Sequence, residues 1–228
     1  MHRILYFLVQ HSLFPLTRLL FFGNRSGIEN LPRAGAYIVA ANHSSYIDHF
    51  LLAALIQKYR KRKIYFLTRA EAFEGYWSRT WHVATNCVPV DRERPEVGAF
   101  RTMAALLKAG EIVVIYPEGT RSESGALLPP KPGAIKLAIH CDVPIVPIGL
   151  IGANRILPKR KIVPRWHRAQ LHIGAPLRPQ DTLRNGKSKE EVALAARDLM
   201  GAIAHLCRSP SATAIPTQGA HTVGEGTT

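Results

Sequence analysis

The chain has 228 residues, of which 46% are hydrophobic, so it can fold as one domain with a substantial core. Its formal net charge of +14 indicates an anionic partner, but charge alone does not distinguish nucleic acid, a membrane surface and a phosphorylated substrate. The three cysteines are far apart and form no CxxC pair, so the sequence indicates neither a zinc site nor a disulfide framework and favours a reducing, cytosol-facing location.

Residues 1–22 are rich in apolar side chains and predict an amphipathic helical segment. The longest uninterrupted apolar run has six residues, whereas a helix that spans a bilayer needs about 20. Polar residues recur at Arg3, Gln10 and Thr17, which favours a helix that lies in a membrane interface. Pro15 is expected to kink or divide it. The alternative is a helix docked on the protein's own core, because amphipathicity does not identify the apolar partner.

Apolar patterns typical of strands and helices alternate over residues 23–208. The predicted strands are residues 36–41, 64–68, 87–90, 111–116, 144–150 and 169–174, and the predicted helices are residues 48–58, 95–109, 132–140 and 189–206. This alternation predicts a single α/β domain with a largely parallel central sheet flanked by helices. Residues 209–228 are rich in Pro, Thr, Gly and Ser, and we expect a disordered tail there.

The first candidate site is NHSSYID, residues 42–48, which follows a short apolar run. The run predicts a buried strand, so His43 lies where the strand ends and a loop begins. Asp48 stands at the predicted N-cap of the next helix, and the turn can bring its carboxylate back to the imidazole. A carboxylate on one ring nitrogen leaves the other free to accept a proton. The pair is a candidate general base with its orienting group; alternatively, Asp48 only caps the helix.

The second candidate site is YPEGTRS, residues 116–122, which also follows an apolar strand pattern. Arg121 can bind a phosphate through two hydrogen bonds, Gly119 lets backbone N–H groups approach closely, and Thr120 adds a hydroxyl donor. Glu118 can hold Arg121 or bond to a substrate hydroxyl. The alternative is a polar turn between a strand and a helix.

Three of the candidate side chains follow predicted strand ends: His43, Arg92 and Glu118. The carboxyl ends of parallel strands meet at one edge of a sheet, where ligand sites form. We therefore expect these three residues to converge.

Together these stretches resemble the glycerophospholipid acyltransferase family, most closely the 1-acylglycerol-3-phosphate acyltransferases. Four motifs carry the resemblance in the family's order: NHSSYID (42–48), VPVDR (88–92), YPEGTRS (116–122) and VPIVPIGL (143–150). Tyr116 stands where the family usually has Phe.

The resemblance implies that His43 and Asp48 are catalytic. The residues that it places at the phosphate end of the acceptor are Arg92, Glu118, Gly119 and Arg121. Thr120 can add its hydroxyl to this group, and Lys131 stands where the family often has a lysine. No metal ligand is implied.

The implied reaction transfers a fatty acyl group from a thioester, acyl-CoA or acyl carrier protein, to the free hydroxyl of 1-acylglycerol-3-phosphate. The product would be phosphatidic acid, in phospholipid biosynthesis. The thioester is a co-substrate, and no cofactor is expected. The alternative within this class is another acceptor, such as a different lysophospholipid or a lyso-aminolipid. Backbone N–H groups of the loop after Asn42 are candidate donors to the tetrahedral oxyanion.

Two basic clusters, residues 58–63 and 154–168, are candidates for contact with anionic lipid headgroups, and Trp166 suits a membrane interface. Both clusters could instead be solvated loops. With the segment 1–22, they predict a monotopic or peripheral protein on the cytoplasmic face of a membrane.

Two other classes fit less well. A nucleic-acid-binding module would explain the charge, but the sequence has no aromatic RNA-binding signature, and the apolar N-terminal segment would have no role. We therefore expect no nucleic-acid partner. A serine hydrolase is not favoured either, because no G-x-S-x-G occurs.

Overall fold

The computed structural model describes residues 2–90, 95–158, 161, 163–183 and 188–208. The predicted tail, residues 209–228, and the candidate phosphate ligand Arg92 lie outside the described residues. The strands are β1 (Phe22–Ser26), β2 (Tyr37–Ala41), β3 (Ile64–Arg69), β4 (Cys87–Val90), β5 (Ile112–Ile115), β6 (Ile145–Ile151) and β7 (Ala169–Ile173).

The helices follow the alternation that the sequence predicts. They are α1 (His2–Leu8), α2 (Phe14–Phe21), α3 (Ile47–Arg60), α4 (Tyr76–Ala84), α5 (Pro95–Lys108), α6 (Gly133–Cys141), α7 (Ala153–Ile156), α8 (Pro179–Thr182) and α9 (Lys189–Arg208). Every predicted strand and helix is present, with ends that shift by at most two residues. β1, α4, α7 and α8 were not predicted.

The strands form one sheet in the order β1-β7-β6-β2-β5-β3-β4. All neighbouring strands are parallel except β6 and β7, which are antiparallel, so β1 and β7 run against the other five strands. The predicted α/β domain with a largely parallel sheet is thus confirmed. The change of strand direction, which was not expected, is confined to β1 and β7, the last two strands on one side of the sheet.

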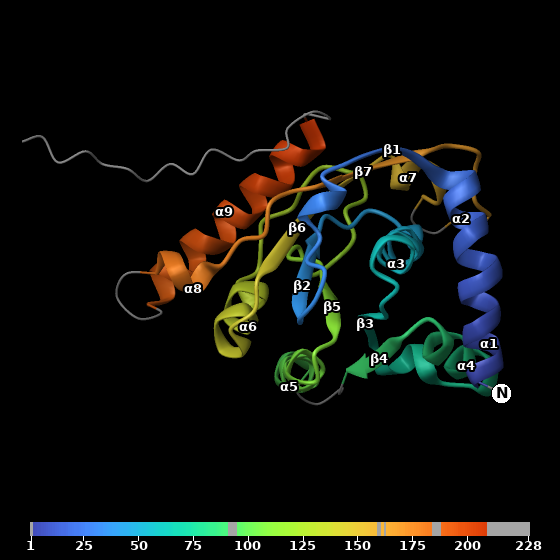
Figure 1. Cartoon of the computed structure of the whole chain (residues 1–228), viewed down its shortest axis with the longest axis horizontal. Coiled ribbons are helices and arrows are strands. Elements are labelled where there is room, and N and C mark those ends of the chain that lie inside the picture. Colours follow the sequence, from blue (N-terminus) through green and yellow to red (C-terminus); the bar gives the residue numbers. More distant parts are fainter. Residues whose placement is uncertain (1, 91–94, 159–160, 162, 184–187, 209–228) are drawn as a thin grey trace, which may run out of the picture.

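Both faces of the sheet are covered by helices (Figure 1). On β2, the alternate residues Tyr37, Val39 and Ala41 pack in the core shared with α3 and the N-terminal helices. Ile38 and Ala40 face the other core, which α5, α6 and α9 build. Because both faces are buried, the strand is apolar throughout, as is usual for a parallel sheet.

The first helices form one nearly continuous rod along the flank of the domain (Figure 1). A π-helical turn, Val9–Leu13, joins α1 to α2 just before Pro15, and the Phe14 N–H bonds to the Val9 carbonyl. Proline has no N–H for the regular ladder, and a π-turn shifts the bonding locally. The expected disruption by Pro15 is therefore a π-turn within a helix that continues.

One side of this rod packs on the domain, and the other is exposed. Val9 and Phe14 are buried in the core, and Arg18 donates to the Ala54 carbonyl and to Gln57 Oε1 on α3. The window Ile4–Phe21 has a mean hydropathy of 1.3 with 17% of it buried, so by length and composition it is a candidate membrane span. The same test is passed by signal sequences and by core helices of soluble proteins.

The junction between β1 and β7 gives a prediction about stability. Gly27 has φ +71°, and a Cβ there would lie 1.9 Å from the Ile173 carbonyl oxygen, whereas Gly35 has φ +76° with open space around it. We expect Gly35→Ala to cost only the left-handed strain, about 1–2 kcal/mol. Gly27→Ala should lower the melting temperature clearly further, because a backbone carbonyl must also move. Equal melting temperatures for the two variants would contradict this close approach.

Candidate active site

His43 and Asp48 are brought together by the loop that follows β2. His43 Nδ1 lies 2.8 Å from Asp48 Oδ2, and the His43 side chain is 11% exposed while that of Asp48 is fully buried. The same carboxylate oxygen accepts the N–H groups of Ser44 and Ser45, each at 2.8 Å. The N–H groups of the loop therefore hold the Asp48 carboxylate in place, and the carboxylate in turn orients the His43 ring.

The expectation that Asp48 is the N-cap residue of α3 is wrong. The helix begins at Ile47 with Tyr46 at its N-cap position, so Asp48 lies inside the first turn. Ser45 Oγ accepts the Ile47 N–H at 3.2 Å, and the Asp48 carboxylate turns back to the preceding loop instead. Because Asp48 engages Nδ1, that nitrogen carries the hydrogen and Nε2 keeps a lone pair that can accept a proton.

The imidazole of His43 lies against the ring of Tyr116. The two ring centroids are 3.8 Å apart at an interplanar angle of 12°. Burial raises the pKa of the Tyr116 phenol well above its ordinary value, so the ring stays neutral. The stack restricts rotation of the His43 side chain and offers an aromatic face to the imidazolium that forms when His43 takes a proton.

A second histidine completes this aromatic group. The His49 ring lies 5.6 Å from that of His43, edge to face, and 4.6 Å from that of Phe66. Burial, with smaller effects from the nearby His43, Arg121 and His82, lowers the pKa of His49 to about 3. His49 is therefore neutral near pH 7 and adds no second positive charge beside His43.

Glu118 is a buried carboxylate that fixes two loops. Its Oε1 accepts the His43 N–H and its Oε2 accepts the Leu128 N–H, both at 2.8 Å. Burial raises its pKa, and these two N–H donors offset part of that rise. Among the described residues no ion pair joins Glu118 to Arg121. The pairing considered for these two residues is thus not formed, and contact of Glu118 with the acceptor stays a prediction.

The turn that follows Glu118 carries the basic side chains of the site. Arg121 stacks on the ring of Tyr46, with Cζ 3.6 Å from the ring centroid, and its Nη1 is buried without a hydrogen-bond partner among the described residues. Gly119 has φ +70°, and the Lys131 side chain lies directly over it, where a Cβ would stand 3.0 Å from Lys131 Cε. Thr120 is exposed on the same turn.

A backbone bond joins the two candidate loops directly, and another closes the second loop on itself. The Ser122 N–H donates to the His43 carbonyl at 2.8 Å, and the Lys131 N–H donates to the Pro117 carbonyl at 2.8 Å. The predicted residues that the structure describes are therefore gathered at one edge of the sheet: His43, Asp48, Glu118, Gly119, Thr120, Arg121 and Lys131. Arg92 follows β4 in sequence and lies outside the described residues, so its convergence stays a prediction.

The candidate oxyanion donors just after Asn42 are already engaged. The His43 N–H bonds to Glu118, and the N–H groups of Ser44 and Ser45 bond to Asp48. Each of these groups would have to leave its carboxylate before it could bind an oxyanion. This geometry therefore does not favour these three N–H groups among the candidate oxyanion donors.

Sequence reasoning missed the structural part that Asn42 plays. Its side chain is buried, its Oδ1 accepts the Leu150 N–H at 2.7 Å, and its Nδ2 donates to the Leu150 carbonyl at 2.9 Å. This pair of bonds joins the end of β2 to β6. A polar residue directly after a strand buried on both faces is a signal that could have identified it, because buried amides need partners.

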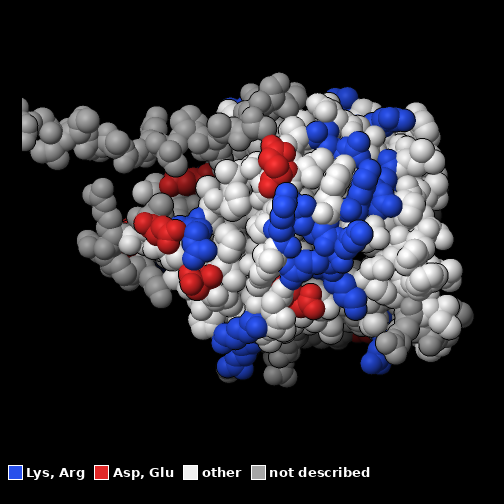
Figure 2. Space-filling view, viewed as in Figure 1, with Lys and Arg blue, Asp and Glu red and all other residues white. Residues whose placement is uncertain are grey.

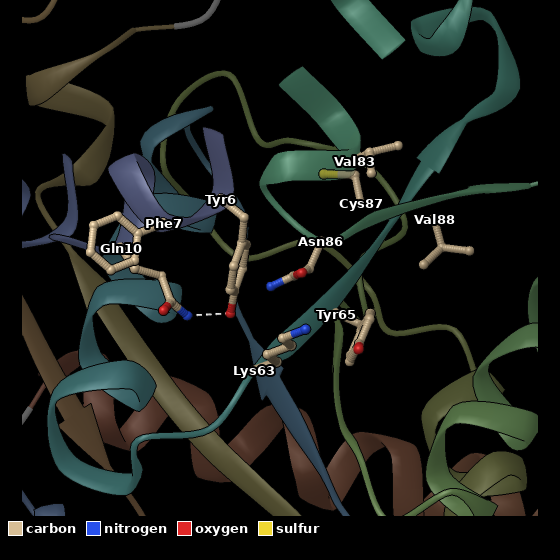
Figure 3. Close-up of a pocket in the computed structure, with 9 residues that line it drawn as sticks. All are labelled: Tyr6, Phe7, Gln10, Lys63, Tyr65, Val83, Asn86, Cys87 and Val88. Atoms are coloured by element: carbon tan, nitrogen blue, oxygen red, sulfur yellow. Dashed lines mark hydrogen bonds between the residues drawn. The ribbon is translucent and has the colours of Figure 1, made fainter. Parts of the chain in front are cut away.

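A hollow of 580 Å³ lies apart from this edge. Tyr6 of α1 lies on one side of it, and Tyr65 of β3 and Val88 of β4 lie on the other (Figure 3). Lys63, which also lines it, precedes β3, so the hollow is next to the start of that strand, whereas His43 follows the end of β2.

Comparisons with known proteins show the family to which the chain belongs. Residues 24–151, more than half of the chain, match the model of the family described as Acyltransferase. The 1-acyl-sn-glycerol-3-phosphate acyltransferase of Bacillus subtilis is 33% identical over 165 residues, which is 72% of this chain and 78% of that protein. A chloroplastic 1-acyl-sn-glycerol-3-phosphate acyltransferase of Brassica napus is 35% identical over 58% of this chain and 38% of its own length.

A solved structure shares the fold. The 1-acyl-sn-glycerophosphate acyltransferase of Thermotoga maritima superimposes with a TM-score of 0.64 at 23% identity, over 90% of this chain and 78% of that one. At this identity the likeness concerns the fold alone. The family itself is shown by the sequence comparisons.

Proposed function

Because this chain belongs to the acyltransferase family, we propose that it transfers a fatty acyl group from a thioester to the free hydroxyl of 1-acylglycerol-3-phosphate, giving phosphatidic acid. The observation that supports this most directly is the His43–Asp48 pair at the end of β2. The names of the relatives from Bacillus subtilis and Brassica napus support the choice of acceptor. The donor is acyl-CoA or acyl carrier protein, and another lysophospholipid or a lyso-aminolipid is the alternative acceptor.

The reaction needs a general base and a carboxylate that orients this base and stabilises its protonated form. His43 Nε2 takes the proton of the acceptor hydroxyl while that oxygen bonds to the thioester carbonyl carbon. The tetrahedral intermediate expels the thiolate, and His43 returns the proton to sulfur. Asp48 stabilises the imidazolium between these steps.

The first prediction concerns this base. His43→Ala should lower kcat by about 10²- to 10⁴-fold with an unchanged circular dichroism spectrum, because the side chain lies at a loop. Asp48→Asn should also lose activity, and it should be less stable, since one amide cannot accept from all three donors of the loop. His205→Ala, an exposed histidine on α9, is the control. A folded His43→Ala protein with nearly full activity would refute the catalytic role.

We infer that the turn after Glu118 binds the acceptor's phosphate. Arg121 supplies a guanidinium whose Nη1 has no partner among the described residues, Lys131 lies over Gly119, and Thr120 is exposed beside them. A planar fork of donors suits the oxygens of a phosphate. Arg92 belongs to the same proposal by family resemblance.

Arg121→Ala should therefore raise the KM for lysophosphatidate and leave the KM for the thioester nearly unchanged. Loss of a charge-assisted contact costs about 1.5–3 kcal/mol, roughly 10- to 150-fold in kcat/KM. Arg121→Lys should recover only part of this loss, since lysine lacks the fork. Arg101→Ala, on the exposed face of α5, is the control.

The competing explanation is that Arg121 only supports Tyr46, on which it stacks. In that case Arg121→Ala would lower kcat/KM equally for both substrates, and the melting temperature of the protein would fall. That result for Arg121→Ala would exclude the phosphate site.

We also propose that the N-terminal rod lies on the cytoplasmic face of a membrane and does not cross it. Its inner side packs on α3 through α2 and on α4 through α1, and its outer side exposes Ile4, Phe7, Leu8, Leu16 and Leu19. Such a helix can bury its apolar outer side in the lipid interface.

Leu16→Ser with Leu19→Ser should move the protein from the membrane fraction toward the soluble fraction without unfolding it. Both side chains point outward, so their loss uncovers no core. Leu194→Ser, an exposed leucine on α9, should change nothing. A tag placed before Met1 and found on the far side of the membrane would show that the rod crosses it.

A further inference from the structure

The segment between α7 and β7 exposes large apolar side chains close to the catalytic edge. Val163 is 71% exposed and Trp166 is 74% exposed. The segment follows β6, whose carboxyl end lies at the same edge of the sheet as that of β2, the strand before His43. An exposed tryptophan suits a boundary between an apolar and a polar region. Its ring can enter the apolar side while its indole N–H bonds to the polar side.

The charge around these two side chains has one sign. Arg155, Lys161, Arg165 and Arg168 are exposed. Residues 153–168 contain no Asp or Glu. On the face drawn in Figure 2, Lys and Arg lie mainly at the centre and right, whereas several acidic side chains lie at the left, toward α8 and α9. A surface with exposed apolar side chains among basic ones complements an anionic lipid headgroup layer.

The other basic cluster, residues 58–63, is largely engaged within the protein. The Arg60 guanidinium donates to the carbonyls of Leu31 and Ile28. That of Arg62 donates to the carbonyls of Gly35 and Gly110. This cluster joins the end of α3 to the start of β3, so it lies next to the opposite edge of the sheet from His43. The two clusters are therefore not equivalent.

The exposed segment adjoins the end of the N-terminal rod. A Cβ on Gly23, two residues after α2, would lie 3.3 Å from Arg168 Cβ and 3.0 Å from the Ala169 carbonyl oxygen. α2 exposes Leu16 and Leu19. The two surfaces that can meet a bilayer thus come from neighbouring parts of the fold.

The segment is also tied to the catalytic loop. The Arg165 N–H donates to the Ile156 carbonyl at 2.7 Å. Ser45 Oγ donates to the carbonyl of the next residue, Leu157, at 2.7 Å, and the Ser45 N–H bonds to Asp48. Contact of this segment with a membrane would therefore bring the catalytic loop to the lipid surface.

We propose that Val163 and Trp166 enter the interface of an anionic bilayer, while the basic side chains around them bind lipid phosphates. This second contact, besides the N-terminal rod, holds the catalytic edge at the surface that contains the acceptor. The inference rests on the proposed function for its purpose, but the binding itself can be measured without any reaction.

The test is co-sedimentation of the full chain with vesicles of phosphatidylcholine alone or mixed with phosphatidylglycerol. Val163→Ser with Trp166→Ala should weaken binding about tenfold on both vesicles. Arg165→Gln with Arg168→Gln should weaken it roughly 30-fold on the anionic vesicles only, at about 1 kcal/mol for each residue. Leu194→Ser and the pair Lys58→Gln with Lys61→Gln are matched controls, and both should bind nearly as the unchanged chain does.

Activity assays then separate docking from chemistry. The same variants should turn over a water-soluble short-chain acceptor at the unchanged rate and a vesicle-embedded acceptor more slowly. Unchanged vesicle binding, or equal loss in the control variants, would overturn the proposal. A loss confined to the acyl carrier protein donor would also overturn it, because the surface would then bind an acidic protein. If the unchanged chain transfers no acyl group, the proposed function is wrong. The membrane contact of Val163 and Trp166 is still tested independently by co-sedimentation with vesicles.

Discussion

The site depends on one buried carboxylate oxygen. Asp48 Oδ2 accepts hydrogen bonds from His43 Nδ1 and from the backbone N–H groups of Ser44 and Ser45. A buried charge is tolerated only where hydrogen bonds replace its hydration, and here two of the three donors are backbone N–H groups of the loop after β2. The interaction that orients the proposed base therefore also folds the loop. Catalytic geometry and local stability cannot be varied independently at this position.

The carboxylate of Glu118 plays a comparable part between loops. It holds the N–H of His43 and that of Leu128, while the Ser122 N–H returns to the His43 carbonyl. The proposed proton acceptor, His43, and the basic turn thus share a backbone frame, so a displacement of one is transmitted to the other. Asn42 adds a third link, because it joins the strand before His43 to β6.

The sequence predicted the fold well where burial imposes a clear period. The strands buried on both faces, such as β2 and β6, appear as short apolar runs, and their order with the helices indicates an α/β sheet. β1 was missed because Phe22–Ser26 has one buried residue and no apolar alternation. The pairing of His43 with Asp48 followed from spacing, but the stack on Tyr116 and the backbone role of Glu118 depend on contacts between distant segments. Spacing within one motif carries no information about such contacts.

The position of β1 has a consequence for how the chain is made. β1 enters the sheet through β7, where Phe22 pairs with Ala169, so the earliest of the described strands to be synthesised cannot pair until the last of them is made. Asn42 likewise waits for Leu150. Chains fold as their segments emerge from the N-terminal end. The N-terminal rod can therefore pack on α3, and make its proposed contact with a bilayer, early in translation, while the candidate active site is completed only after β6 is made. During synthesis, attachment to a membrane can precede the capacity for reaction.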